Sequence, residues 1–238
     1  MTTHNLAYNR NREFLRVTLT QIYFTFIQAI PLIIVIGVAS GVAVSFQAKA
    51  GLSITGDNSH LGKILVVILF REVCPLFASL LLITRSATAV ASEMATMKVG
   101  LEIEALEVMG IKVSSYILKP RIVAGTISIF CMAFALFLSS IVGAWLGANF
   151  TSYFPAIQLL DSLASSFFPL DIIFFIIKTT IIGALIMRVA CLRGLSLNKA
   201  SFEVPIVTNM AVVDCLFVAL SAQAVISGTL YLVNGIGL

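Results

Sequence analysis

Charged residues are scarce in this chain of 238 residues. Aspartate, glutamate, lysine and arginine together make up 11% of it, whereas average soluble domains are about one quarter charged. Hydrophobic residues make up 59%, and the mean hydropathy is +1.05. A water-soluble domain of this length could not cover its surface with so few charges, so we expect lipid to be the surrounding solvent. The length also leaves no room for both a membrane bundle and a separate catalytic domain.

Residue patterns typical of metal, haem and nucleotide sites are also missing. His4 and His60 are the only histidines, so we expect no metal site and no cofactor in this chain. Residues 56–63 come nearest to a phosphate-binding loop, but their glycine spacing is wrong and Ile64 follows where Ser or Thr is needed. The sequence therefore predicts a non-catalytic protein that does not hydrolyse ATP itself. Without a CxxC pair, four cysteines are expected to be small hydrophobic residues: Cys74, Cys131, Cys191 and Cys215.

Five apolar runs are long enough to cross a bilayer, whose hydrocarbon core requires about 20 helical residues. They cover residues 22–46, 64–92, 122–149, 167–190 and 205–233. The expected fold class is therefore an all-α membrane protein with five transmembrane helices, in one domain over residues 1–238. Residues 1–21 mix arginines with apolar side chains and predict a short interfacial helix on the membrane surface. A cleaved signal peptide ending at Ala50 is the alternative, although the apolar run is long for one.

Positive charge is distributed unevenly between the two sides of these spans. Two lysines, Lys49 and Lys63, fall on one side. Ten lysines and arginines fall on the other: Arg10, Arg12, Arg16, Lys98, Lys112, Lys119, Arg121, Arg188, Arg193 and Lys199. Because they are spread over short loops, they indicate membrane orientation and not a nucleic-acid-binding patch. The asymmetry predicts a cytoplasmic N-terminus and a C-terminus outside, as an odd number of spans requires.

Ionisable side chains within a span are costly in free energy and mark candidate functional sites. Span two carries Arg71, Glu72 and Arg85, span four carries Lys178, and span five carries Asp214. Lys178 could pair with Glu72 or with Asp214 to hold helices together, or these groups could line a cavity for a polar head group; both interpretations stay open. Adjacent residues point about 100° apart, so Arg71 and Glu72 should not share one partner. Arg85, near the end of its span, could extend to the membrane surface.

Proline and glycine predict the local geometry of the first two spans. Pro31 and Pro75 each remove a backbone hydrogen bond and are expected to bend their helices. Gly37 and Gly41 form a GxxxG pair, which permits close contact with another helix. We interpret this pair as a packing feature and not as part of a chemical site.

Residues 99–110 predict a short amphipathic helix on the cytoplasmic side. Leu101, Leu106 and Met109 are apolar, and three glutamates lie among them: Glu102, Glu104 and Glu107. Gly110 is a natural C-terminal stop for this helix. The helix could simply lie on the surface, or it could be a coupling helix that docks into a groove of a cytoplasmic partner.

Four stretches of the chain resemble one family. They are LFREVCP at residues 69–75, EMATMK at 93–98, EALEVMG at 104–110 and KPR at 119–121. With their spacing, they resemble the MlaE (YrbE) permeases, the membrane subunits of MCE-type ABC transporters for phospholipids. The resemblance is specific because several polar residues fall at fixed spacing within an apolar background. The chain departs from the family at residues 84–89 and 205–210, where family glycines and arginines are replaced.

The resemblance implies a permease subunit that moves phospholipids between the inner membrane and a periplasmic MCE-domain partner, which maintains outer-membrane lipid asymmetry. It implies a homodimer in the bacterial inner membrane, two ATPase subunits that bind ATP and magnesium, and in some systems a STAS-domain subunit. It implies that residues 99–110 are the coupling helix. Residues that match the family's polar or proline positions are Arg71, Glu72, Pro75, Arg85, Glu93, Lys178 and Asp214. The competing hypothesis is a secondary transporter or ion channel with Glu72, Lys178 and Asp214 as a relay.

Overall fold

The computed structural model describes residues 15–52, 61–151, 155–167, 169–197 and 201–233. Every secondary-structure element in these residues is helical. Five helices are long and apolar enough to span a membrane: Leu15–Gly51, Val66–Val99, Tyr116–Phe150, Pro169–Gly194 and Val204–Thr229. The five predicted spans and the all-α fold class are confirmed. The first four helices continue past the apolar runs at one end or both, because polar residues extend them beyond the length that a bilayer requires.

Short non-α stretches subdivide these helices. The helical elements after residue 26 are η1 (Ile27–Ala29), α2 (Ile30–Leu52), α3 (Leu61–Leu65), η3 (Val66–Val73), α4 (Cys74–Leu82), η4 (Ile83–Ala87), α5 (Thr88–Val99), α6 (Glu102–Val108), η5 (Ser114–Leu118), α7 (Lys119–Thr151), α8 (Ala156–Ser166), α9 (Pro169–Gly194), η6 (Ser201–Glu203) and α10 (Val204–Val233). Of these, η1 and η6 are 3-10 helical. The stretches η3, η4 and η5 are π-helical.

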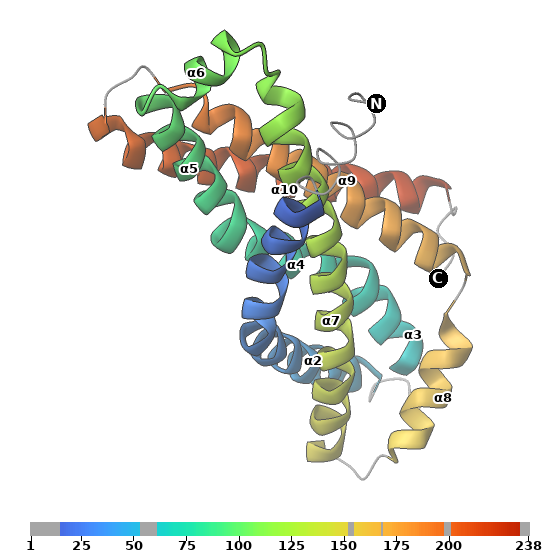
Figure 1. The fold of residues 1–238 in the computed structure, drawn as a ribbon. Helices are drawn as coiled ribbons and strands as arrows, with labels where there is room; N and C mark the ends of the chain where they lie inside the picture. Colours follow the sequence, from blue (N-terminus) through green and yellow to red (C-terminus); the bar gives the residue numbers. More distant parts are fainter. Residues whose placement is uncertain (1–14, 53–60, 152–154, 168, 198–200, 234–238) are drawn as a thin grey trace, which may run out of the picture.

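Both prolines singled out in the sequence lie next to a change of helical geometry. The 3-10 stretch η1 comes just before Pro31, and Figure 1 shows the chain turning there between residues 15–26 and α2. The π-helical stretch η3 ends two residues before Pro75. Proline lacks an N–H and its ring clashes with the carbonyl four residues earlier, so the preceding turn departs from α geometry.

The predicted interfacial helix falls mostly on residues 1–14, which lie outside the described residues. Its described part, residues 15–21, is helical. This part continues into the first span, within the single helix Leu15–Gly51. The helix changes direction after these residues, at η1 before Pro31.

Close contact between α2 and α7 organises one side of the bundle. In Figure 1, α7 runs along the molecule, and it packs against both α2 and α9. A Cβ atom added to Gly41 would lie 2.0 Å from the carbonyl oxygen of Ser140 in α7. In return, Gly143 and Gly147 of α7 pack directly on α2. The predicted Gly37–Gly41 packing is confirmed, and α7 supplies a second GxxxG pair that the sequence analysis missed.

At the end of the molecule away from α6, the connection between spans three and four contains α8, which was not predicted (Figure 1). This helix packs against α3, where the backbone N–H of Gly62 donates to Ser162 Oγ at 3.1 Å. Its 11 residues are too few to cross a bilayer. Leu159 and Leu163 face inward, and Ile157 and Leu160 are exposed, so α8 is a short amphipathic helix.

The interior holds the cysteines and an aromatic cluster. Cys74, Cys191 and Cys215 are buried, as expected for small hydrophobic residues, and Cys131 is half-buried. All four are free thiols. Phe70 stacks on Phe175 with ring centroids 4.3 Å apart, and Phe137 packs edge-on to Phe70. Large apolar side chains also cover much of the outer surface, for example Val35, Ile173 and Phe217. Such a surface fits a lipid solvent.

Candidate functional site

A polar network joins spans two, four and five. Its members are Glu72 in η3, Lys178 in α9, and Gln223 and Ser227 in α10. The Lys178 residue is 1% exposed. Its Nζ lies 3.0 Å from Glu72 Oε2 and 2.7 Å from Ser227 Oγ. Ser227 Oγ also donates to Glu72 Oε2 at 2.9 Å, so one carboxylate oxygen connects all three spans.

Lys178 also supplies a hydrogen bond that Pro75 cannot make. In an α-helix the N–H of residue 75 would donate to the carbonyl of residue 71, but proline has no N–H. Lys178 Nζ donates to this Arg71 carbonyl at 2.7 Å. Gln223 Nε2 donates to the next carbonyl, that of Glu72, at 3.1 Å, and to Glu72 Oε2 at 3.3 Å. Side chains of neighbouring spans therefore satisfy the backbone where span two is irregular.

Arg71 has a partner of its own at the beginning of span four. Its Nη2 lies 2.6 Å from Asp171 Oδ1, and the Asp171 side chain is 3% exposed. Arg71 and Glu72 thus have separate partners, as predicted. Asp171 and Lys178 are seven residues apart in α9, about two helical turns, so both partners lie on one face of that helix. Asp171 did not stand out in the sequence because it lies at the edge of an apolar run.

The network encloses very little space within one chain. Arg71, Asp171, Phe174, Phe175 and Lys178 line a cavity of about 10 Å³, which is close to the volume that one water molecule needs. The Glu72 side chain, in contrast, is 32% exposed. The polar network therefore reaches the surface of the chain at Glu72, and this cavity cannot hold a lipid head group.

Asp214 does not belong to this network. It forms an ion pair with Arg193 of α9. Asp214 precedes Gln223 by nine residues, or about 13 Å along α10. The possible pairing of Lys178 with Asp214 is therefore wrong, and Gln223 and Ser227 are the α10 residues that meet Lys178 and Glu72. Gln223 and Ser227 are uncharged. Their spacing of four residues, which places them on one face of the helix, was the only indication in the sequence that they act together.

Two other candidate residues lie along span two, apart from the network. Glu93 in α5 pairs with Arg121 Nη2 in α7 at 2.6 Å. Arg85, in η4, is exposed and donates to Gln28 Oε1 at 3.4 Å. Next to it, Ser86 accepts a hydrogen bond from Thr25 Oγ1 at 3.1 Å. Arg85 is thus part of the contact between the first helix and span two.

The predicted coupling helix is shorter than residues 99–110. Its α6 core covers Glu102–Val108, and Leu101 precedes it with a left-handed φ of 60°. At the other end Gly110 has a φ of 75°, as expected for a glycine stop. The backbone N–H of Gly110 donates to the Glu107 carbonyl at 2.9 Å, and that of Ile111 to the Leu106 carbonyl at 3.0 Å. These two bonds form a Schellman motif, which ends the helix sharply.

The orientation of α6 separates inward from outward residues. Ile103 is buried, and Leu106 is half-buried against the core. Val108 is 88% exposed and Met109 is 64% exposed. Figure 1 shows α6 at an extremity of the molecule. Leu106 therefore faces the protein's own interior, and Val108 and Met109 are available to a partner. Five further candidates of this segment are also exposed: Leu101, Glu102, Glu104, Glu107 and Gly110.

Known proteins share this sequence pattern. The profile of a family described as permease MlaE matches residues 18–229. A probable ABC transporter permease protein of Rickettsia prowazekii is 26% identical over 201 residues, which cover 84% of this chain and 78% of that protein. An intermembrane phospholipid transport system permease protein, MlaE of Haemophilus influenzae, is 24% identical over 226 residues, 92% of this chain and 85% of that protein. The chloroplastic protein TRIGALACTOSYLDIACYLGLYCEROL 1 of Arabidopsis thaliana is 26% identical over 187 residues, 79% of this chain and 53% of that protein.

Proposed function

Because this chain belongs to the MlaE permease family, and is thus an ABC transporter permease, we propose that it moves phospholipids between the inner membrane and a periplasmic MCE-domain protein. This transport would maintain the lipid asymmetry of the outer membrane. The observation that carries the proposal is the Glu72–Lys178 network, a polar group that joins three apolar spans and reaches the surface of the chain. A phospholipid requires apolar walls for its tails and a few polar groups for its head.

A homodimer completes the cavity in this proposal. One chain encloses about 10 Å³ beside Lys178, so larger walls must come from a second copy. The outer face of α10 is the surface that we assign to the dimer. Within its most apolar 18 residues, 28% are buried, the lowest share among the five spans. Exposed residues recur along this face at spacings of four and three: Ile206, Met210, Val213, Phe217 and Leu220.

The remaining partners follow from the two ends of the molecule. Two ATPase subunits, which bind ATP and magnesium, each contact one α6 at the cytoplasmic end. The acidic and apolar surface of α6 supports this assignment. The MCE-domain protein lies at the other end, beside α8, and a STAS-domain subunit accompanies some such transporters. The ten-to-two distribution of lysine and arginine supports the orientation of this assembly in the inner membrane.

The alternative transporter or channel needs Glu72, Lys178 and Asp214 as neighbours in one relay. Asp214 is instead paired with Arg193, about 13 Å along α10 from the residue that contacts Glu72. No observation on the described residues favours this second function.

Reconstitution tests the proposal. The tagged chain is purified from its source cell in mild detergent, and its co-purifying subunits are identified by mass spectrometry. The complex is then placed in liposomes that contain a fluorescent phospholipid, and transfer to the MCE-domain protein is followed with and without ATP. We expect an ATPase and an MCE-domain protein in the complex and ATP-dependent lipid transfer. An equal rate of lipid transfer with and without ATP, or a purified complex that contains no ATPase, would overturn the proposal.

A further inference from the structure

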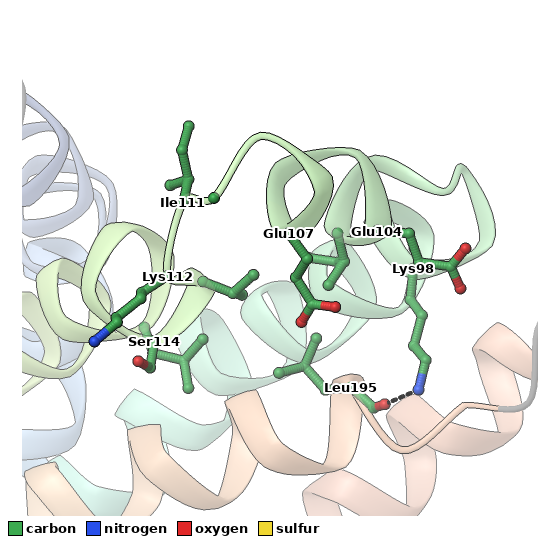
Figure 2. Close-up of a pocket in the computed structure, with 11 residues that line it drawn as sticks. Lys98, Glu104, Glu107, Ile111, Lys112, Ser114 and Leu195 are labelled. Atoms are coloured by element: carbon green, nitrogen blue, oxygen red, sulfur yellow. Dashed lines mark hydrogen bonds between the residues drawn. The ribbon is translucent and has the colours of Figure 1, made fainter.

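A hollow of about 700 Å³ lies behind α6. It is bounded by α6, by residues 110–118 and by Leu195, just after α9 (Figure 2). Ile103, Val113, Leu118 and Leu195 give it apolar walls. The hollow is separate from the Glu72–Lys178 network, because its lining includes no residue of η3 or α10.

Glu107 is the charged side chain that points into this hollow. Figure 2 shows its carboxylate turned from α6 toward Leu195. Lys98 lies at the edge and donates its Nζ to the Leu195 carbonyl, while Lys112 extends away from the hollow. Glu104 also lines the hollow and has an interaction of its own. Among the described residues, no cation or hydrogen-bond donor pairs with the Glu107 side chain.

We propose that this hollow receives a lysine or arginine side chain of the ATPase subunit, with Glu107 as its ion-pair partner. The inference rests on the proposed function, which supplies the ATPase. A long basic side chain has an apolar stem and a charged end. Ile103 and Leu118 would contact the stem, and the Glu107 carboxylate would meet the cation.

The charge of α6 supports a basic partner surface. The helix carries Glu102, Glu104 and Glu107 and has no lysine or arginine. Opposite charges across an interface favour the correct partner and fix its register. Val108 and Met109, both largely exposed, follow directly after Glu107. A partner that covers these apolar residues therefore brings its neighbouring side chains to the hollow, which favours a protein over a small ligand.

This contact would hold α6 from two sides. The exposed Val108 and Met109 would pack on the surface of the ATPase, and the inserted side chain would hold the helix from behind through Glu107. Movement of the ATPase would then be transmitted to α6. From there it would reach α5, which packs on α6, and α9, which packs on α5.

Binding of the ATPase to charge variants tests this proposal. Affinity is measured for the wild-type permease and for Glu107→Gln, Glu107→Arg and Glu102→Arg in detergent, at low and high salt. Glu102→Arg is the matched control, because Glu102 lies on the same helix and is exposed but does not line the hollow. We expect at least about tenfold weaker binding for Glu107→Gln and a larger loss for Glu107→Arg. Glu102→Arg removes part of the same acidic surface, so it should also weaken binding, but clearly less than Glu107→Arg, because an exposed charge at the rim of an interface contributes little.

Three outcomes would overturn the proposal. Wild-type affinity of Glu107→Gln together with loss of binding by Val108→Asp would show that the ATPase docks on α6 without using the hollow. Equal losses of ATPase affinity for Glu102→Arg and Glu107→Arg would show that the negative charge of α6 as a whole attracts the ATPase, without a specific role for Glu107. If no ATPase binds the wild-type chain, the proposed function itself fails, which the first two outcomes leave intact.

If Glu107→Arg folds poorly, Glu107→Gln still decides the test, because glutamine has nearly the same shape as glutamate. Restored binding of Glu107→Arg to an ATPase with one lysine or arginine changed to glutamate would identify the inserted side chain.

Discussion

Lys178 occupies the hydrogen-bonding position that Pro75 leaves open in span two. Its Nζ donates at 2.7 Å to the carbonyl of Arg71, the acceptor that a residue with an N–H at position 75 would use in an α-helix. The same Nζ pairs with Glu72. The irregular turn of span two and its ion pair with span four therefore depend on a single side chain.

Lys178→Met should destabilise the folded protein strongly. The change leaves the Glu72 carboxylate without its cation and the Arg71 carbonyl without this donor. Breaking a buried ion pair costs about 3–5 kcal/mol, and we expect the lower end because the Glu72 side chain is 32% exposed. Thermal unfolding in detergent measures the loss. Arg85→Met is the control, since Arg85 is exposed and makes one long hydrogen bond of 3.4 Å. Equal melting temperatures for the two variants would contradict the prediction.

Glu72→Gln should assemble with its partners but lose lipid transfer. Glutamine keeps the shape, and its oxygen can still accept hydrogen bonds from Lys178, Ser227 and Gln223, so we expect a smaller loss of stability than for Lys178→Met. It removes the negative charge that pairs with Lys178. A hydrogen bond to a charged group contributes about 1.5–3 kcal/mol, so transfer should fall at least about tenfold. Complex yield and ATP-dependent transfer are measured together. Asp214→Asn is the comparison, because its partner is Arg193, and we expect it to retain transfer. Full transfer by Glu72→Gln would remove this residue from the transport pathway.

The sequence predicted the spans and the ionisable residues within them well, because both depend on composition and local periodicity. It did not predict which charges meet. Whether Lys178 reaches Glu72 or Asp214 depends on the register of three packed helices, and one helical turn changes the answer. Gln223 and Ser227 were missed because neutral polar residues are common in spans and carry no strong signal.

The sequence also predicted only one of the two ends of α6. Gly110 was predicted as a stop because glycine adopts a positive φ easily. The left-handed Leu101 could not be foreseen, since bulky residues rarely adopt this conformation. It sets the start of α6 and therefore which side of the helix faces inward. Leu106, an apolar residue of the predicted coupling helix, packs against the core.

Gly41→Leu should disrupt the packing of α2 on α7. A Cβ at Gly41 would lie 2.0 Å from the Ser140 carbonyl oxygen, which is backbone and cannot move aside alone. Overpacking of this kind costs about 1–3 kcal/mol or more. Gly51→Leu on the same helix is the matched control, because nothing lies within 4 Å of a Cβ there. Size-exclusion profiles and melting temperatures are compared. Similar behaviour of both variants would show that close α2–α7 contact is not needed for folding.

The C-terminus should lie outside the cytoplasm. The expected orientation follows from ten lysines and arginines on one side of the spans and two on the other. A fluorescent reporter that folds only in the cytoplasm is fused after Leu238, and an enzyme reporter that is active only outside is fused at the same place in a second strain. We expect a signal from the second fusion alone. Fluorescence from the first would reverse the orientation and move the ATPase contact away from α6.

Two copies of the chain should be joined by a cysteine placed on the outer face of α10. Phe217 is 75% exposed and is the most exposed residue of the stripe from Ile206 to Leu220. In a two-fold dimer through this face whose axis passes near Phe217, this residue approaches its own counterpart, so Phe217→Cys should form a disulfide across the interface. The native cysteines Cys74, Cys191 and Cys215 are buried, and Cys131 is replaced by serine in all samples. Ile173→Cys on α9 is the control, because Ile173 is 52% exposed but lies on a different span. Mild oxidation in native membranes, followed by non-reducing electrophoresis, should give a dimer band for Phe217→Cys only. A dimer band from Ile173→Cys alone would assign the interface to α9, while monomers in both samples would leave α10 facing lipid and the cavity without its second wall.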